Sequence, residues 1–311
     1  MKKILIIDRM HDSILPMLEA LDCDVRYSPD WDRAKILENL DGVEGIFVRS
    51  KTSIDRALID LAPDLRFIAR AGAGLEKMDV DYLGQKEVVI VNAPEGNRDS
   101  LGEHTIGVLL ALLHKLHTAD REVRSRIWDR EGNRGMELGG KTVGIFGYGF
   151  MGSAFAQKLQ GFNCKVLAYD KYKRGFGNNN IEEVSLEKLK AETEILSIHV
   201  PLTAETNGLF DSLFLEGFDR LKVLINTARG GIISNATVIE LLKNGKILAA
   251  GLDVLENEKL GTMDARQEAE FDFLAQSDQV ILTPHVGGWS HESYQRINEV
   301  LVTKLVDLKL L

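Results

Sequence analysis

A glycine-rich segment in the middle of the chain has the residue types and spacing that could hold a phosphate group. Residues 147–152 read GYGFMG, a GxGxxG pattern that follows an apolar run over 142–146 and precedes a helical pattern starting at Ser153. The first glycine permits a tight turn, the second lets backbone amides approach a pyrophosphate, and the third lets the helix lie close to the strand. The helix N-terminus then faces the negative charge. The segment therefore predicts a dinucleotide site.

The next strand pattern ends in an acid that bears on the choice of dinucleotide. Asp170 follows the run KVLAY, and a carboxylate there can accept hydrogen bonds from both ribose hydroxyls. Its charge would also repel a 2′-phosphate. Lys171, Lys173 and Arg174 follow directly and could neutralise such a phosphate if the loop curled back. We predict NAD, with NADP left open by these three basic side chains.

The length and composition of the chain bound the fold that holds these residues. With 311 residues the chain is too long for one ordinary core and suits two domains of roughly 100 to 200 residues each. Hydrophobic residues make up 44%, which is ordinary for a globular protein. The net charge of -9 disfavours nucleic acid and anionic membranes as partners. No apolar run is long enough to cross a bilayer and no signal-peptide pattern is present, so we expect a cytoplasmic protein.

Strand and helix patterns alternate in two series. From residue 2 to residue 94, short β-branched runs alternate with helical patterns at 13–21 and 32–40. Because the runs are apolar on both faces, they suit a parallel sheet covered by helices on each side. We therefore predict a small flavodoxin-like domain in this part of the chain.

The second series follows a predicted connecting helix over about 100–125, for which Asp99 and Ser100 are candidate caps. Six strand patterns then predict a Rossmann unit, and an amphipathic helix over 293–311 could return to the first domain. Both sheets are predicted to be parallel and doubly wound. The smaller, flavodoxin-like substrate domain is predicted to take residues 1–98 and 290–311, and the Rossmann NAD-binding domain residues 99–289. The six strand patterns are KTVGIFGYG, KVLAYD, ILSIHVP, VLINTARG, ILAAGLDVL and VILTPHVGG.

Seven motif blocks lie in order along nearly the whole chain. They are RAGAGLEKMD at 70–79, VNAPEGNRDSLGEHTIG at 91–107, the GxGxxG segment, HVPLTAETNGLF at 199–210, INTARGGII at 225–233, AGLDVLENE at 250–258 and TPHVGG at 283–288. Together they resemble the D-isomer-specific 2-hydroxyacid dehydrogenase family. Its members include phosphoglycerate, lactate, glycerate and glyoxylate enzymes and, on the same scaffold, NAD-sensing corepressors.

The resemblance implies three catalytic residues, Arg229, Glu258 and His285. Reduction of a 2-keto acid builds negative charge on the carbonyl oxygen and leaves a carboxylate that needs a partner. The planar guanidinium of Arg229 matches a carboxylate and stays charged. His285 would supply the proton, and Glu258 beside it would favour the imidazolium and fix the ring. Taken singly, the three would be a surface arginine, a solvated acid and a turn histidine, so the family order carries the catalytic interpretation.

The same resemblance assigns residues to the substrate and to the cofactor. Asp253 has a plainer alternative as a strand-end hydrogen-bond partner, and His199 could instead be structural. The residues matched to substrate contacts are Arg49, Ser50, Ala73, Gly74 and Asn97. The residues matched to the cofactor are Gly147, Tyr148, Gly149, Phe150, Met151, Gly152, Asp170, His199, Pro201, Thr206, Thr227, Ala228, Asp253, Gly287 and Gly288.

The family implies hydride transfer between NAD(H) and a small anionic D-2-hydroxy acid or 2-keto acid. We take 3-phosphoglycerate as the first substrate to try, with Arg49 as a candidate phosphate contact. An NADH-sensing corepressor would share the same residues and is the alternative, and an NAD-dependent hydrolase is a third possibility. The family likeness and the long connecting helix favour a homodimer. The chain ends soon after TPHVGGWS, so we expect no added regulatory domain.

Two features depart from the family pattern. The segment 259–282 is longer than expected, and Lys259 replaces the proline that commonly follows the glutamate, which bears on the placement of Glu258. Trp289 stands where smaller residues are frequent, and it could line the substrate cleft or be a core aromatic.

Metal-ligand spacing is missing around the cysteines and around the His291-Glu292 pair, so we expect no metal site. The cysteines are Cys23 and Cys164.

Overall fold

The computed structural model describes all residues from Met1 to Leu311 and divides them into two α/β units. One unit comprises Met1–Arg98 and Trp289–Leu311, and the other comprises Asp99–Gly288. The sequence-based division differs only in assigning Trp289 to the second unit. None of the helices combines the length and the apolar character that a membrane crossing requires.

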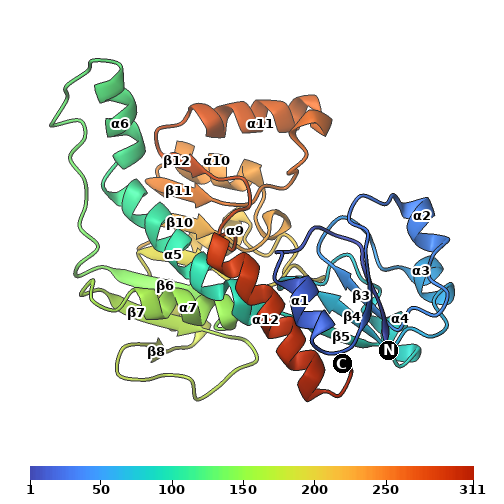
Figure 1. The fold of residues 1–311 in the computed structure, drawn as a ribbon. Helices are drawn as coiled ribbons and strands as arrows, with labels where there is room; N and C mark the ends of the chain where they lie inside the picture. The colour runs from blue at the N-terminus through green and yellow to red at the C-terminus, as the bar shows by residue number, and fades with distance from the viewer. The chain divides into compact units, whose positions relative to one another are not determined.

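The first unit is built on a five-stranded parallel sheet with the order β2-β1-β3-β4-β5, of which Figure 1 labels β3, β4 and β5. The strand order reverses between β1 and β3, which confirms the predicted flavodoxin-like arrangement. Successive residues of β1 and the residue after it alternate between two cores, with Ile4 and Ile6 on one face and Leu5 and Ile7 on the other. The strands are β1 (Lys3–Ile6), β2 (Asp24–Tyr27), β3 (Gly45–Val48), β4 (Phe67–Arg70) and β5 (Val89–Asn92), and the helices are α1 (Ile14–Glu19), α2 (Arg33–Leu37), α3 (Arg56–Asp60), α4 (Val80–Gln85) and α12 (His291–Asp307).

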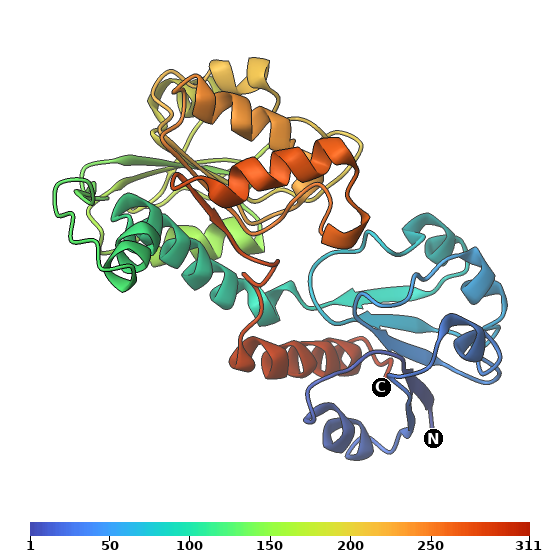
Figure 2. The ribbon, with the colours of Figure 1, turned by 90° about the horizontal axis from the view of Figure 1, so that it is seen from above.

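The C-terminal helix α12 returns to the first unit, as predicted. Figures 1 and 2 both show it beside α1. Its apolar residues Ile297, Leu301 and Leu305 are buried in the same core as the strand residues of that face. Gly96 permits the close approach, because a Cβ at this position would lie 2.7 Å from the Cα of Ile297. The buried Asn298 side chain donates to the carbonyl oxygen of His11 and thereby ties α12 to the loop after β1.

The second unit contains a seven-stranded parallel sheet with the order β12-β11-β10-β9-β6-β7-β8. All six predicted strands are confirmed, and the two-residue strand β8 is an addition that the sequence patterns did not predict. The strands are β6 (Thr142–Phe146), β7 (Lys165–Tyr169), β8 (Glu182–Glu183), β9 (Ile195–Ile198), β10 (Val223–Asn226), β11 (Ala249–Leu252) and β12 (Val280–Leu282). The helices are α5 (Pro94–Leu113), which begins in the first unit, α6 (Leu116–Arg124), α7 (Phe150–Lys158), α8 (Leu186–Glu192), α9 (Ser212–Glu216), α10 (Asn235–Lys243) and α11 (Ala265–Gln276), with short 3-10 turns η1 (Gly230–Ile232) and η2 (Leu260–Thr262).

The single connecting helix predicted over 100–125 is wrong in both its start and its continuity. The chain forms α5 and then α6, and Lys115 between them has a φ of 51°, in the left-handed region that ends a helix. The first helix starts at Pro94, where a missing N–H costs no helical hydrogen bond. Asp99 and Ser100 therefore lie inside α5 and do not cap it.

Candidate active site

The three proposed catalytic residues lie on loops that follow three neighbouring strands. Arg229 comes just after β10, Glu258 lies in the loop after β11, and His285 comes just after β12. Because these strands are parallel, their carboxyl ends meet at one edge of the sheet. Ligands of open α/β sheets bind at this edge.

The imidazole of His285 contacts the carboxylate of Glu258. Its Nδ1 atom lies 2.9 Å from Oε1 and 3.0 Å from Oε2 of Glu258. Both side chains are nearly half exposed, at 44% and 46%. A carboxylate at Nδ1 orients the ring and leaves Nε2 for proton exchange. The unusual segment that begins at Lys259 therefore does not separate Glu258 from the histidine.

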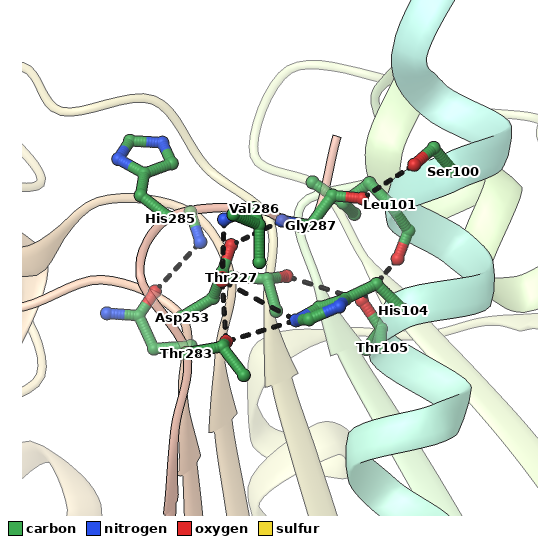
Figure 3. A network of polar contacts seen from close by, with 12 residues as sticks. Ser100, Leu101, His104, Thr105, Thr227, Asp253, Thr283, His285, Val286 and Gly287 are labelled. Atoms are coloured by element: carbon green, nitrogen blue, oxygen red, sulfur yellow. Dashed lines mark hydrogen bonds and ion pairs between the residues drawn. The ribbon is translucent and has the colours of Figure 1, made fainter. Parts of the chain in front are cut away.

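A buried carboxylate organises the turn that carries this histidine (Figure 3). Asp253 is only 3% exposed. Its Oδ1 accepts from the hydroxyl of Thr283 at 2.6 Å and from the amide of Val286 at 2.9 Å, and its Oδ2 accepts from the amide of Gly287 at 2.8 Å. Burial raises the pKa of Asp253, but hydrogen bonds from His104, Thr283 and the two amides outweigh it, so the pKa lies below its usual value. The carboxylate is therefore charged.

The backbone of His285 adopts a conformation that L residues rarely take. Its φ is 56°, in the left-handed region, which costs roughly 1–2 kcal/mol. Its amide donates to the carbonyl oxygen of Asp253 at 2.8 Å, and the next two amides bind the Asp253 carboxylate. Figure 3 shows the imidazole projecting away from this network. These contacts correspond to the plainer alternative for Asp253, a strand-end hydrogen-bond partner, and they fix the direction of the imidazole.

We expect Asp253→Asn to lower the free energy of unfolding by about 1–3 kcal/mol at neutral pH, because buried donors lose their charged acceptor. The folded-state pKa of Asp253 is depressed, so its contribution is present above the unfolded pKa and is lost as pH falls through the folded pKa. Urea unfolding at neutral and successively lower pH measures the difference between wild type and variant. That difference should shrink in acid, while the exposed control Asp272→Asn changes little throughout. A difference that stayed constant into acid would contradict this assignment.

The loop that carries Arg229 packs against the loop that leads to Glu258. A Cβ at Gly230 would lie 1.9 Å from the carbonyl oxygen of Leu255, so this position accepts only glycine without displacing one of the loops. The fully buried Asn226 donates to the carbonyl oxygen of Arg229 at 3.0 Å and accepts from the amide of Ala228 at 3.0 Å. The backbone is therefore fixed on both sides of the arginine.

The three glycines of the GxGxxG segment differ in how much space a side chain would have at each position. Gly147 has a φ of 97°, and a Cβ there would lie 2.7 Å from the carbonyl oxygen of His199. A Cβ at Gly152 would lie 2.0 Å from the carbonyl oxygen of Gly147, whereas nothing lies within 4 Å of a Cβ at Gly149. Open space therefore adjoins the N-terminus of α7, where Phe150 is the first helical residue. Backbone amides facing open space at a helix N-terminus fit a pyrophosphate.

Asp170 directs its carboxylate to backbone amides beside this turn. Its Oδ2 accepts from Tyr148 at 2.8 Å, and its Oδ1 accepts from Tyr172 and Lys173 at 2.9 Å each. Burial raises the pKa of Asp170, and the three amide hydrogen bonds lower it to a net value below the usual range. An ionised carboxylate offers about four acceptor positions. Three backbone amides occupy part of this capacity, and the acceptor positions that remain can take a ribose hydroxyl.

The basic residues after Asp170 all have partners within the same unit. Lys171 forms an ion pair with Glu205. Lys173 donates through Nζ to the carbonyl oxygen of Tyr148 at 3.1 Å, and Arg174 donates to the carbonyl oxygen of Asp170 at 2.6 Å. These contacts direct the positive charges to internal acceptors. They support the choice of NAD over NADP.

Several residues that were matched to the adenosine and nicotinamide ends are engaged inside the protein. His199 is buried, its Nε2 lies 2.8 Å from the hydroxyl of Ser197, and burial lowers its pKa to about 3, so it is neutral. The hydroxyl of Thr206 donates to the carbonyl oxygen of Pro201 at 2.6 Å. The hydroxyl of Thr227 lies 3.4 Å from the hydroxyl of Thr105. These side chains fix the loops at the carboxyl edge. Ala228 is buried, Met151 and Gly288 are partly exposed, and Phe150 is exposed.

Comparison with known proteins identifies the family. Residues 106–287 match the family described as D-isomer specific 2-hydroxyacid dehydrogenase, NAD binding domain. The chain belongs to this family. Its residues 106–287 are the NAD-binding domain, which confirms the predicted family and cofactor.

Individual relatives cover almost the whole chain. A D-3-phosphoglycerate dehydrogenase from Archaeoglobus fulgidus is 31% identical over 98% of this chain and 57% of its own length. A glyoxylate reductase from Thermofilum pendens is 32% identical over 93% of this chain and 85% of its own length. A solved D-lactate dehydrogenase from Aquifex aeolicus, complexed with NAD and lactic acid, has a TM-score of 0.82 and 27% identity, with 99% of this chain and 96% of that chain covered. The chain spans only slightly more than half the length of the phosphoglycerate dehydrogenases that it matches.

The residues matched to substrate contacts lie in the first unit. Arg49 and Ser50 follow β3, and Ala73 and Gly74 follow the neighbouring strand β4, so all four lie near the carboxyl edge of this sheet. The carbonyl oxygen of Ala73 accepts from the side chain of Asn92 at 2.8 Å. Asn97 lies in α5, and its Oδ1 is buried without a hydrogen-bond partner.

Sequence reasoning missed the supporting contacts of His104, Asn226 and Asp8. His104 contacts Thr283 at 3.1 Å and lies 3.5 Å from Asp253. Asp8 is buried and accepts from the amides of Arg49 and Lys51. In the sequence, Asp8 and Asn226 could be noticed only as polar residues at the ends of strand patterns. His104 could be noticed only because it lies in the motif block at 91–107 that resembles the family. Neither signal reveals a partner that lies far away in the sequence.

Proposed function

We propose that the chain is an NAD-dependent oxidoreductase that interconverts a D-2-hydroxy acid and its 2-keto acid. The contact between His285 and Glu258 carries the proposal, because it pairs a proton donor with a carboxylate at the ligand-binding edge of an NAD-binding sheet. The open space beside Gly149 supports a dinucleotide at the same edge.

The proposed residues meet the demands of keto-acid reduction one by one. Bound nicotinamide supplies the hydride for reduction and accepts it in the reverse direction. His285 donates a proton from Nε2 to the carbonyl oxygen and takes it back during oxidation, while Glu258 stabilises the imidazolium. Arg229 binds the substrate carboxylate through its planar fork. The amides of Ala73 and Gly74 are further proposed donors to this carboxylate.

We propose 3-phosphoglycerate and its 2-keto product as the first substrate pair to test. Relatives named D-3-phosphoglycerate dehydrogenase, up to 35% identical, support this choice, and Arg49 is the proposed phosphate contact. A glyoxylate reductase at 32% identity makes small unphosphorylated acids the second group to test.

The deciding experiment follows NADH oxidation with a panel of phosphorylated and plain 2-keto acids, with NADPH in parallel. Turnover of at least one acid with NADH, and weaker turnover with NADPH, is the expected result. The corepressor alternative shares the catalytic residues and predicts NADH binding with negligible turnover of every acid. A hydrolase would bind NAD without net consumption of the cofactor. Either of these outcomes rejects the dehydrogenase proposal.

We further propose a second copy of the chain as the protein partner. Large apolar side chains are exposed on α6 and on the segment that follows it, and Trp128 is 79% exposed. Such a concentration of apolar surface is typical of an interface between proteins. Light scattering measures the molar mass in solution, and a monomer would reject the homodimer. The other exposed apolar residues in this region are Leu116, Val123, Ile127 and Met136.

A further inference from the structure

The guanidinium of Arg49 lies against two aromatic rings in the first unit. Its Cζ atom is 3.9 Å from the ring centroid of Trp289 and 5.0 Å from that of Tyr294. The two ring centroids are 5.4 Å apart. Both cation–ring distances lie within the roughly 6 Å over which a cation is attracted to an aromatic face. The departure from the family pattern at Trp289 therefore has a specific neighbour.

Stacking covers the faces of the guanidinium and leaves in-plane N–H donors beyond the one that Tyr294 engages. A guanidinium carries its N–H donors in the plane of the group, and an aromatic ring covers only the face. Tyr294 contacts Arg49 through a side-chain hydrogen bond as well as through its ring. Burial lowers the pKa of Arg49, while Tyr294 and Asp8 act to raise it. A partly desolvated cation with in-plane donors is suited to bind an anion.

Several contacts hold both the arginine and its aromatic neighbours. The carboxylate of the buried Asp8 accepts from the backbone amide of Arg49. Ser290 and Ser293 form a capping box that fixes the start of α12, between Trp289 and Tyr294. The His11 ring meets Tyr294 edge-on, with centroids 5.6 Å apart. The stacked group is therefore anchored to β1, β3 and α12.

The place of this cluster in the sheet favours a ligand. His11 and Arg49 lie on the loops after β1 and β3, the two strands between which the strand order reverses. Open α/β sheets bind ligands outside the carboxyl ends of the strands at this switch point. Trp289 is 53% exposed, so a ligand can reach the cluster.

We propose that Trp289 and Tyr294 are positioning residues that hold the Arg49 guanidinium in one orientation for an anionic group of the substrate. The inference rests on the proposed function, since it assigns residues to the binding of a 2-hydroxy or 2-keto acid. The anionic group is a carboxylate or a phosphate, which Arg49 can bind with two parallel hydrogen bonds.

The kinetic test compares Trp289→Leu with the conservative Trp289→Phe, using the best substrate of the panel. Loss of the ring should raise KM by about two- to thirtyfold with little change in kcat, and phenylalanine should restore most of the binding. The matched control is Trp31→Leu, because Trp31 also lies under an arginine of this unit, with the Cζ of Arg26 5.7 Å from its ring. An unchanged KM in Trp289→Leu, or an equal rise in the control, overturns the inference.

A binding test separates this inference from the proposed function. The chain has 3 tryptophans, so replacing Trp31 and Trp128 by phenylalanine leaves Trp289 as the only reporter of emission. Titration with 3-phosphoglycerate and with D-lactate should change this emission, and Arg49→Lys should weaken the response. The two probes distinguish a phosphate from a carboxylate. An Arg49-dependent response without turnover supports the inference and rejects the dehydrogenase, whereas turnover without any such response rejects the inference alone.

Discussion

Replacing His285 by alanine is expected to lower kcat by about 10²- to 10⁴-fold, the usual contribution of a positioned general acid. Binding of NADH should be nearly unchanged, because the imidazole projects away from the network that holds the turn (Figure 3). Steady-state assays with the best keto acid measure kcat, and fluorescence titration measures the dissociation constant for NADH. A variant with wild-type turnover would remove His285 from the mechanism.

Glu258→Gln separates orientation of the ring from stabilisation of its charge. An amide at this position can still accept a hydrogen bond from Nδ1 of His285, which lies 2.9 Å from Oε1, but it cannot stabilise an imidazolium. Turnover should therefore fall, by less than in His285→Ala. The exposed His114 gives a matched control, since His114→Ala removes an imidazole of the same unit without touching this pair. An equal loss in the control would point to a general effect on the protein.

Most of the strands could be predicted from the sequence because they are short apolar runs buried on both faces, as in β3, β6, β9, β10 and β11. Neighbouring residues such as Ile145 and Phe146 enter different cores on opposite faces of the sheet. The two-residue strand β8 carries no such signal, because Glu182 and Glu183 are polar and are recruited only by pairing with β7. Local sequence therefore specifies the apolar strands and gives no signal for this short polar strand at the edge of the sheet.

The error in the connecting helix has a tertiary cause. The apolar periodicity continues beyond Leu113, so the sequence gives no reason for a break. In the structure the carbonyl oxygen of Leu113 accepts a hydrogen bond from the amide of Met136 at 2.8 Å. The backbone of Lys115 adopts a left-handed conformation. A contact with a segment that comes later in the chain thus ends α5, and a local pattern cannot show it.

In the candidate site, too, features set by neighbouring residues could be predicted from the sequence, whereas contacts between distant segments could not. The glycine pattern at 147–152 predicted a strand-to-helix turn, and α7 begins within it. The pairing of His285 with Glu258 followed from family order, since spacing along the chain does not fix which loops meet. The stacking of Trp289 on Arg49 was beyond both kinds of reasoning, because it depends on the return of α12 to the first sheet.

Replacing Arg229 by alanine is expected to impair substrate binding and turnover together. Removing one partner of a hydrogen-bonded charge pair costs about 2–5 kcal/mol, which is about thirty- to several-thousand-fold in kcat/KM. The arginine is proposed to bind the substrate carboxylate, and its charge lies beside the carbonyl where negative charge develops, so both KM and kcat should change. Arg229→Lys should recover only part of the loss, because an ammonium carries the charge but lacks the planar fork.

The neighbouring glycine distinguishes a chemical role of Arg229 from a structural one. Gly230→Ala should also reduce turnover, because its Cβ would meet the carbonyl oxygen of Leu255 at 1.9 Å and displace the loops that carry Arg229 and Glu258. That variant should lose stability to urea as well, whereas Arg229→Ala should unfold close to wild type while its turnover collapses. The exposed Arg220 supplies the control, since Arg220→Ala removes a guanidinium of the same unit at 58% exposure. Normal keto-acid turnover by Arg229→Ala would exclude this residue from the mechanism, and equal losses of stability in both loop variants would make its role structural.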